Sequence, residues 1–209
     1  MTQAKIDLKK ADKELYYPSK KEFELIEVPE MPFLMVDGRG SPDGESFGLA
    51  VEALFAVSYT VKFMSKEDPG LDYVVMPLEG LWWADDMAVF QPEKQDKSQW
   101  LWRAMVRQPD HISTGMIDGA VERTRAKKKA LGGLDLLRLK TFHEGLSVQI
   151  THIGPFSEEG PTIHRLHHEF IPAKGLEENG VHHEIYLSDI RRTAPEKLKT
   201  VLRQPVRKV

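Results

Sequence analysis

The order of apolar patterns repeats in this chain of 209 residues: each half carries a strand-like segment, an amphipathic helix and two further strand-like segments. Residues 23–40 contain two apolar runs separated by prolines, which indicate strands. The Ser-Pro-Asp tripeptide at 41–43 then opens a helix, because it supplies a candidate N-cap, a first-turn proline and an acid near the positive end. Strands over 72–83 and 98–109 complete the first set.

A helix predicted over 114–130 and closed by two glycines leads into the second set. The elements of this set are a strand over 146–154, a helix over 157–170 that Pro172 ends, a strand over 181–189, and a helical turn before a strand over 197–206. The sequence therefore predicts an α+β fold of two tandem, duplicated β-α-β-β units, whose antiparallel sheets carry helices on one face.

The duplication also sets the expected domain organisation. Residues 1–20 are predicted to be a loosely ordered polar lead-in, and residues 21–209 a single domain with halves of about 21–112 and 113–209. The tripeptide Arg-Gln-Pro closes the last strand of both halves, at 107–109 and at 203–205. If the two sheets lie side by side, their uncovered faces meet in a groove between the units, where we expect a ligand.

Charge and composition exclude several classes of partner. The formal net charge is −3, whereas nucleic-acid binders usually present a basic face. The absence of cysteine excludes disulfides, iron–sulfur clusters and thiol catalysis. The N-terminus lacks the apolar core of a signal peptide, and Glu52 and Lys62 interrupt the longest apolar stretch, Leu49 to Met64. We therefore expect a cytoplasmic protein with no nucleic-acid, membrane or obligate protein partner.

All four tryptophans lie on the two neighbouring strands predicted over 72–83 and 98–109. Strand alternation places Trp82 and Trp83 on opposite faces and Trp100 and Trp102 on the same face. Each tryptophan alone is explained equally well by core packing. Four together exceed what one sheet face usually needs, so a pocket wall that stacks on a flat ligand is the alternative.

Glu184 is the second candidate for chemistry. Alternation along the strand puts Glu184 and Tyr186 on one face and the apolar Ile185 and Leu187 on the other. If the face of Glu184 is the groove, its carboxylate lies among aromatic rings, where burial raises its pKa. Such a group can bind a cationic ligand or act as a general base. A solvated glutamate on an exposed strand face is the other interpretation.

Metal and cofactor sites are not expected. His164 and His168 have the i, i+4 spacing of a zinc-binding helix, but the helix lacks the HExxH pattern. The sequence also contains no GxSxG motif, P-loop or Rossmann fingerprint. We predict no metal and no cofactor.

Several blocks of the sequence resemble the GyrI-like small-molecule-binding domain. The blocks are PFLMVDGRG (32–40), PLEGLWW (77–83), VQITHIGPF (148–156), HHEIYLSD (182–189) and PEKLKT (195–200). Their order and spacing cover nearly all of residues 20–209. The resemblance implies two β-α-β-β units with a ligand groove between them, and it assigns ligand contact to the strand glutamate that Glu184 matches.

The tryptophan-rich first half is similar to a stand-alone subgroup of this family that hydrolyses cyclopropane-bearing DNA-alkylating natural products in an aromatic cage. The leading hypothesis is therefore a cytoplasmic xenobiotic-binding hydrolase of hydrophobic polycyclic compounds. The alternative is a non-catalytic module that sequesters aromatic or cationic small molecules. An inhibitor of gyrase or of another large partner is a third reading, because some family members inhibit gyrase.

The candidate site combines both lines of argument. Glu184 is the expected general base, and Tyr186 the expected donor to the substrate oxygen. The expected ligand-binding residues are Trp82, Trp83, Trp100, Trp102, Tyr59, Phe156 and His152. Register decides which of Trp82 and Trp83 faces the pocket.

Overall fold

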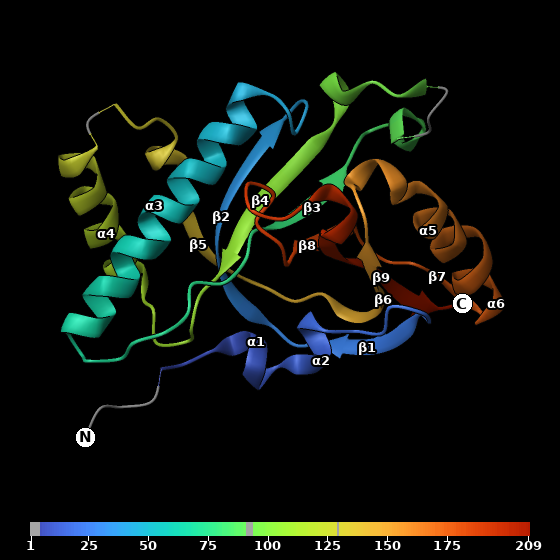
Figure 1. Ribbon diagram of the computed structural model, residues 1–209, viewed down its shortest axis with the longest axis horizontal. Coiled ribbons are helices and arrows are strands. Elements are labelled where there is room, and N and C mark those ends of the chain that lie inside the picture. The colour runs from blue at the N-terminus through green and yellow to red at the C-terminus, as the bar shows by residue number, and fades with distance from the viewer. Residues whose placement is uncertain (1–4, 91–93, 129) are drawn as a thin grey trace. The chain divides into compact units, whose positions relative to one another are not determined.

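The computed structural model describes residues 5–90, 94–128 and 130–209 (Figure 1). The chain divides into two compact units. The first unit comprises Met1–Leu8 and Met31–Phe142, and the second comprises Lys9–Glu30 and His143–Val209. Each unit contains an antiparallel sheet that carries helices, so the predicted α+β class is confirmed.

Four strands form the sheet of the first unit, in the order β3, β4, β2, β5. Their bounds are Met31–Arg39 (β2), Glu79–Trp83 (β3), Leu101–Arg107 (β4) and Arg138–Phe142 (β5). β3 is shorter than the predicted strand over 72–83, because Pro77 has no amide hydrogen to give to a ladder. Within the described residues, 3₁₀ turns between these elements include Met87–Phe90, Lys97–Gln99 and Leu134–Leu136.

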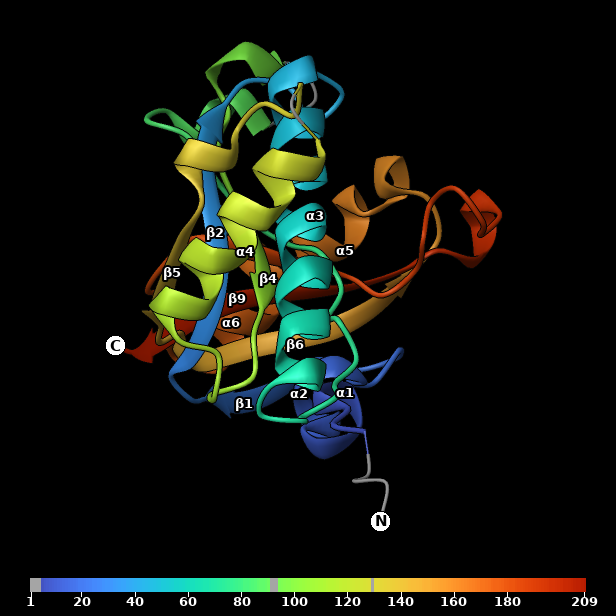
Figure 2. The ribbon, with the colours of Figure 1, turned by 90° about the vertical axis from the view of Figure 1, so that its left-hand side faces the viewer.

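Helix α3 (Glu45–Glu67) packs on β2 and β4, and helix α4 (Thr114–Lys127) lies beside α3 (Figure 2). Helix α3 has 23 residues and contains an 18-residue window with a mean hydropathy of 1.4, so it is long and apolar enough to cross a membrane by length and composition alone. Yet Leu54, Val57 and Val61 are fully buried in the first unit. Their three- and four-residue spacing forms one face of the helix, as expected for a core helix.

The first turn of α3 differs from the prediction. Gly44 occupies the N-cap position, two residues after the predicted proline. The Ser41 hydroxyl instead accepts a hydrogen bond from the Asp43 amide in the turn before the helix. Ser41 therefore shapes the entry turn and does not cap the helix.

The second unit contains a sheet with the order β1, β6, β9, β8, and β7 pairs with the other end of β9. The bounds are Glu24–Val28 (β1), Gly145–Ile153 (β6), Leu176–Glu178 (β7), His182–Tyr186 (β8) and Lys199–Lys208 (β9). The helical turn predicted before the last strand is present at Pro195–Lys197.

An irregular helical segment covers one face of this sheet. It runs through a 3₁₀ turn at Phe156–Glu158, α5 at Gly160–Arg165, a π-helical turn at Leu166–Phe170 and α6 at Ile171–Ala173. The helical segment ends at Ala173, one residue after the proline that was predicted to end it, because the π-helical turn continues into α6.

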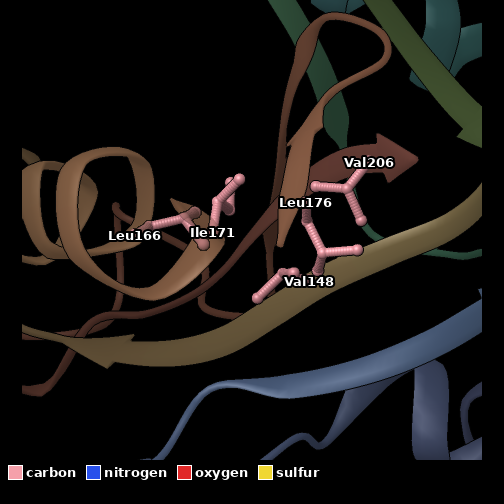
Figure 3. Close-up of a cluster of buried hydrophobic side chains, with 5 residues drawn as sticks. All are labelled: Val148, Leu166, Ile171, Leu176 and Val206. Carbon is pink, nitrogen blue, oxygen red and sulfur yellow. The ribbon is translucent and has the colours of Figure 1, made fainter. Parts of the chain in front are cut away.

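This helical segment encloses the apolar core of the second unit (Figure 3). The buried side chains are Val148, Leu166, Ile171, Leu176 and Val206. Val148 and Val206 belong to β6 and β9, whereas Leu166 and Ile171 come from the helical segment. The helical segment therefore covers the sheet face that carries Val148 and Val206.

The other face of the same sheet is covered by the N-terminal segment, which we expected to be loosely ordered. It forms two short helices, α1 (Leu8–Ala11) and α2 (Lys13–Tyr16), and Leu15 and Tyr16 are buried. The Arg203 guanidinium donates to the Leu15 carbonyl at 2.6 Å. The Thr151 hydroxyl donates to the Pro18 carbonyl at 2.9 Å. These bonds order the segment.

The compact units do not coincide with the predicted halves of about 21–112 and 113–209. β1 belongs to the second unit, although it lies in the first half of the sequence. α4 and β5 belong to the first unit, although they follow residue 112. The β-α-β-β order is nevertheless present in each unit, as β2, α3, β3, β4 and as β6, the helical segment, β8, β9.

Candidate functional site

β8 presents Glu184 and Tyr186 on one face of its sheet and His183 and Ile185 on the other. Ile185 is fully buried, as the sequence predicts for a core position. The alternation is therefore as expected, and the register of the strands decides what Glu184 faces.

Glu184 lies opposite Leu202 of β9, which lies opposite Ile150 of β6. Because side chains two residues apart share a face, Glu184 shares its face with Val148 and Val206 of the helix-covered core. We expected Glu184 on the face that carries no helices. The structure places it on the helix-covered side, since the N-terminal segment occupies the other side.

Two side chains lie next to the Glu184 carboxyl group, and a third packs against one of them. The Tyr186 hydroxyl donates a hydrogen bond to Glu184 Oε2 at 2.8 Å. His182 Nε2 lies 3.7 Å from Glu184 Oε1. The ring of Phe156 meets the ring of Tyr186 edge-on, with centroids 5.5 Å apart. The Glu184 side chain keeps only 16% of its surface exposed, so the carboxyl group lies in a largely aromatic, partly dry environment.

A second carboxyl group, which sequence reasoning missed, belongs to Glu159 beside α5. Glu159 is 4% exposed, and its Oε1 atom has no hydrogen-bond partner within the described part of the chain. Burial raises the pKa of Glu159, and the negative charge of Glu184 raises it further, while the nearby Thr200 hydroxyl opposes part of the rise. Glu159 is therefore a buried carboxylic acid that retains its proton more firmly than an ordinary glutamate.

The pKa of Glu184 is also raised, mainly by burial, while the Tyr186 hydrogen bond and the nearby His183 oppose the rise. Burial, together with the charges of His167 and His183, lowers the pKa of His182 to about 3. His182 is therefore neutral near pH 7, and its contact with Glu184 is not an ion pair.

His152 and Phe156 lie in the same unit. His152, which is largely buried, pairs with Thr200 across β6 and β9 and so shares the face of Glu184. Its Nε2 atom has no hydrogen-bond partner among the residues that the structure describes. Phe156 is 42% exposed and therefore keeps ring surface that a ligand can contact.

The tryptophans belong to the first unit, where they form a separate aromatic cluster. Trp82 and Trp102 are a cross-strand pair of β3 and β4, and both are buried. The Phe47 ring of α3 lies 5.5 Å from Trp82 and 5.0 Å from Trp102. A Cβ atom on Gly38 would lie 2.2 Å from the Trp102 ring, so only glycine fits there. These two tryptophans occupy the packed interface between sheet and helix.

Trp100 and Trp83 are placed differently. Trp100 lies directly before β4 with an extended backbone, and its carbonyl accepts a hydrogen bond from the Gly40 amide at 2.8 Å, so it shares the face of Trp102 as predicted. Its ring stacks on Phe90 with centroids 4.6 Å apart and meets Trp82 edge-on at 5.9 Å. Trp83 alternates to the face opposite Trp82. Trp83 and Trp100 are both half-buried, so both keep some accessible surface.

Tyr59 lies on α3 and is 50% exposed. Its ring packs against Phe55, one turn earlier on the same helix. The predicted site residues thus fall into three places: the Glu184 face of the second unit, the tryptophan cluster of the first unit, and the surface of α3.

The carboxyl pair of the second unit can perform acid–base chemistry. Two buried carboxyl groups that interact cannot easily both be ionised, so one stays protonated while the other carries the charge. Glu159 is the group that holds the proton, because its surroundings disfavour the charge more strongly. The pair therefore offers a proton donor and a proton acceptor near neutral pH.

The histidines do not form a metal site in the described residues. Residues 5–90, 94–128 and 130–209 contain no group of three or more ligating side chains that could hold an ion. The rings of His164 and His168 lie 4.5 Å apart, and His167 Nδ1 pairs with Glu178 Oε1 at 2.6 Å.

Comparison with known proteins places this geometry in context. The family model of the GyrI-like small molecule binding domain matches residues 21–207. An uncharacterized conserved protein from Listeria innocua is 45% identical, with a TM-score of 0.88, over 97% of this chain and 100% of its own. Two hydrolases from Listeria innocua are 44% and 43% identical, with TM-scores of 0.84 and 0.86, over 97% and 98% of this chain and 100% of theirs. No curated protein gives a significant match.

Proposed function

Because the chain belongs to the GyrI-like small-molecule-binding domain family, we propose that it is a cytoplasmic hydrolase of xenobiotics. Its substrates are flat, polycyclic, neutral compounds that carry a cyclopropane conjugated to a dienone. The observation that carries the proposal is the buried pair of Glu159 and Glu184 with Tyr186 bound to one member. The two similar Listeria innocua hydrolases support the reaction class.

The proposed reaction adds one water molecule across a strained carbon–carbon bond. The water oxygen attacks a cyclopropane carbon, the ring bond breaks, and its electron pair moves through the conjugated system to the dienone oxygen. Ionised Glu184 takes a proton from the attacking water, and protonated Glu159 gives a proton to the oxygen, which becomes a phenol. Glu184 gains one proton and Glu159 loses one, so the total number of protons on the enzyme is unchanged.

Tyr186 has a different role in this proposal from the one expected from the sequence. Its hydroxyl hydrogen is directed at Glu184 Oε2, so Tyr186 orients the base and does not donate to the substrate. Phe156, with its exposed ring, and Tyr186 contact the flat substrate in the second unit. The tryptophans belong to the first unit, where Trp83 and Trp100 retain accessible ring surface and Trp82 and Trp102 belong to the core.

The test uses a duocarmycin-type alkylator as substrate. We expect the purified protein to convert it to a product heavier by one water, detected by mass spectrometry. Glu184→Gln keeps the shape of the side chain and removes the base, so turnover should fall by about 10²-fold or more while binding of the neutral substrate changes little. Glu158→Gln is the matched control, because Glu158 is exposed and should leave turnover unchanged. Conversion no faster than without protein rules out the enzymatic proposal.

The same carboxyl group supports a second candidate function, a binding module without turnover. A buried glutamate next to Phe156 and Tyr186 can act as the counter-ion of a lipophilic aromatic cation. Tight binding of tetraphenylphosphonium that is lost in Glu184→Gln, with no hydrolysis of the alkylator, would favour this function over the first.

A further inference from the structure

A hollow of about 390 Å³ opens on the second unit, lined chiefly by Lys9, Tyr17, Lys20, Thr151, Ser188 and Lys199. Thr151 lies opposite Val201 on β9, and Val201 lies opposite Ile185 on β8. Thr151 therefore points to the sheet face opposite Glu184, the face that the N-terminal segment covers. The hollow is distinct from the proposed catalytic groups, and its role does not depend on them.

The lining of this hollow is positively charged. Lys9, Lys20 and Lys199 come from α1, from the segment after α2 and from the start of β9, so three separate parts of the chain bring ammonium groups together. No acidic side chain lines the hollow within the described residues, and none of the three lysines forms an ion pair there. Three like charges at one concavity create a positive potential that favours an anion.

Hydroxyl and aromatic groups complete the lining. The Ser188 hydroxyl accepts a hydrogen bond from the Lys199 amide at 3.1 Å, which leaves its own hydrogen available for a ligand. The Tyr17 side chain is 55% exposed and supplies both a ring face and a phenol. The volume is within the range of about 300–1,000 Å³ typical of small-molecule sites.

We propose that this hollow binds a phosphorylated small molecule. Lysine ammonium groups bind phosphate as point charges, and three of them line the hollow. The phosphoryl oxygens face the three lysines and the Ser188 hydroxyl, and the rest of the molecule lies against Tyr17. The whole chain has a formal net charge of −3, so the attraction for an anion comes from the lysines that line this hollow and not from the overall charge of the protein.

The experiment measures binding of inorganic pyrophosphate and of ADP by isothermal titration calorimetry at low and at moderate salt. We expect saturable binding that weakens as salt rises, with ADP binding more tightly than pyrophosphate because its ring contacts Tyr17. Removing one ammonium group by Lys199→Gln should weaken binding by roughly fivefold. The triple variant Lys9→Gln, Lys20→Gln, Lys199→Gln should abolish it.

Lys140→Gln, which removes an exposed lysine on β5 of the first unit, is the matched charge control and should leave binding unchanged. The circular dichroism spectrum and the melting temperature of the triple variant should match those of the parent, which shows that the variant is folded. Citrate that binds as tightly as pyrophosphate would contradict the assignment to phosphate. Absence of saturable pyrophosphate binding, or equal binding in the triple variant, would overturn the proposal.

Discussion

At the scale of single residues, the two buried carboxyl groups determine how the rate depends on pH. Glu184 must be ionised to act as a base, and burial raises its pKa, so the rate should fall with decreasing pH earlier than for an ordinary glutamate. Glu159 must be protonated to act as an acid, so the rate should also fall at high pH. A pH–rate profile between about pH 5 and pH 9 should therefore be bell-shaped.

Glu159→Gln tests the alkaline side of this profile. The variant has no carboxyl group to titrate, so its residual rate should lose the decrease at high pH and keep the decrease at low pH. An unchanged profile in this variant would assign the alkaline decrease to a different group.

Glu159 should also make stability depend on pH. Its pKa is raised in the folded protein, so between the unfolded and folded pKa values the native state binds more protons than the unfolded state. The free energy of unfolding should therefore fall as pH rises through this window. Thermal unfolding at several pH values should show that the stability of the parent protein falls more steeply with rising pH than the stability of Glu159→Gln. Equal slopes of stability against pH in the two proteins would contradict this account.

The sequence predicts one of these carboxyl groups and not the other. Glu184 stands out because it interrupts an apolar strand, and the alternation of β8 gives its face. Glu159 lies in the polar stretch Ser-Glu-Glu-Gly, where neither periodicity nor composition separates it from Glu158. Only the fold shows that Glu159 is buried and that Glu158 is not.

At the scale of elements, the four tryptophans divide by their position relative to β3 and β4. Trp102→Ala removes a fully buried ring from between the sheet and α3 and should destabilise the protein by about 3–5 kcal/mol, with or without ligand. Trp100→Ala removes a half-buried ring that precedes the strand, and it should cost less stability. Urea unfolding and ligand affinity, measured for both variants, separate the roles.

If the tryptophan cluster of the first unit binds an aromatic ligand through Trp100, Trp100→Ala should weaken that binding by more than its loss of stability explains, by roughly 1–3 kcal/mol. If the loss of affinity in both variants is no larger than the increase in the unfolded fraction of the protein explains, both rings serve packing alone.

Elements with strong periodicity were predictable, and short polar ones were not. α3, β4, β6 and β9 follow from apolar spacing over seven or more residues. β5 and β7 have five and three residues and mixed polarity, so their pairing with β2 and β9 is what makes them strands. The continuation of the helical segment through Pro172 depends on a π-helical turn that a local pattern does not reveal.

At the scale of the whole molecule, a buried charge network holds the second unit together. Glu144 Oε1 lies 3.0 Å from His183 Nδ1, and Glu144 Oε2 lies 3.1 Å from Arg203 Nη1. Burial alone would raise the pKa of Glu144, but the charges and hydrogen bonds of His183 and Arg203 hold it at about 2. Stability from this group is therefore present above the ordinary carboxyl pKa and is lost as pH falls toward about 2.

Glu144→Gln should lower the free energy of unfolding at pH 7 by roughly 3 kcal/mol, because it leaves the buried Arg203 guanidinium without its counter-ion. Denaturant unfolding at neutral and at acidic pH should show a large difference from the parent at neutral pH and a smaller one in acid. Glu14→Gln, at an exposed residue of the same unit, is the control. Equal stability at neutral pH would show that the network contributes nothing.

The division of the chain between its two units has a consequence for biosynthesis. The second unit needs Lys9–Glu30 and His143–Val209, and Arg203 bonds to a carbonyl 188 positions earlier. As the polypeptide leaves the ribosome from its N-terminus, β1 must therefore wait for β6 until more than half of the protein has been translated. The intervening Met31–Phe142 is nearly all of the first unit, so it can fold during this delay as a domain inserted within another. Closing so long a loop is entropically costly, and we expect the second unit to complete folding last.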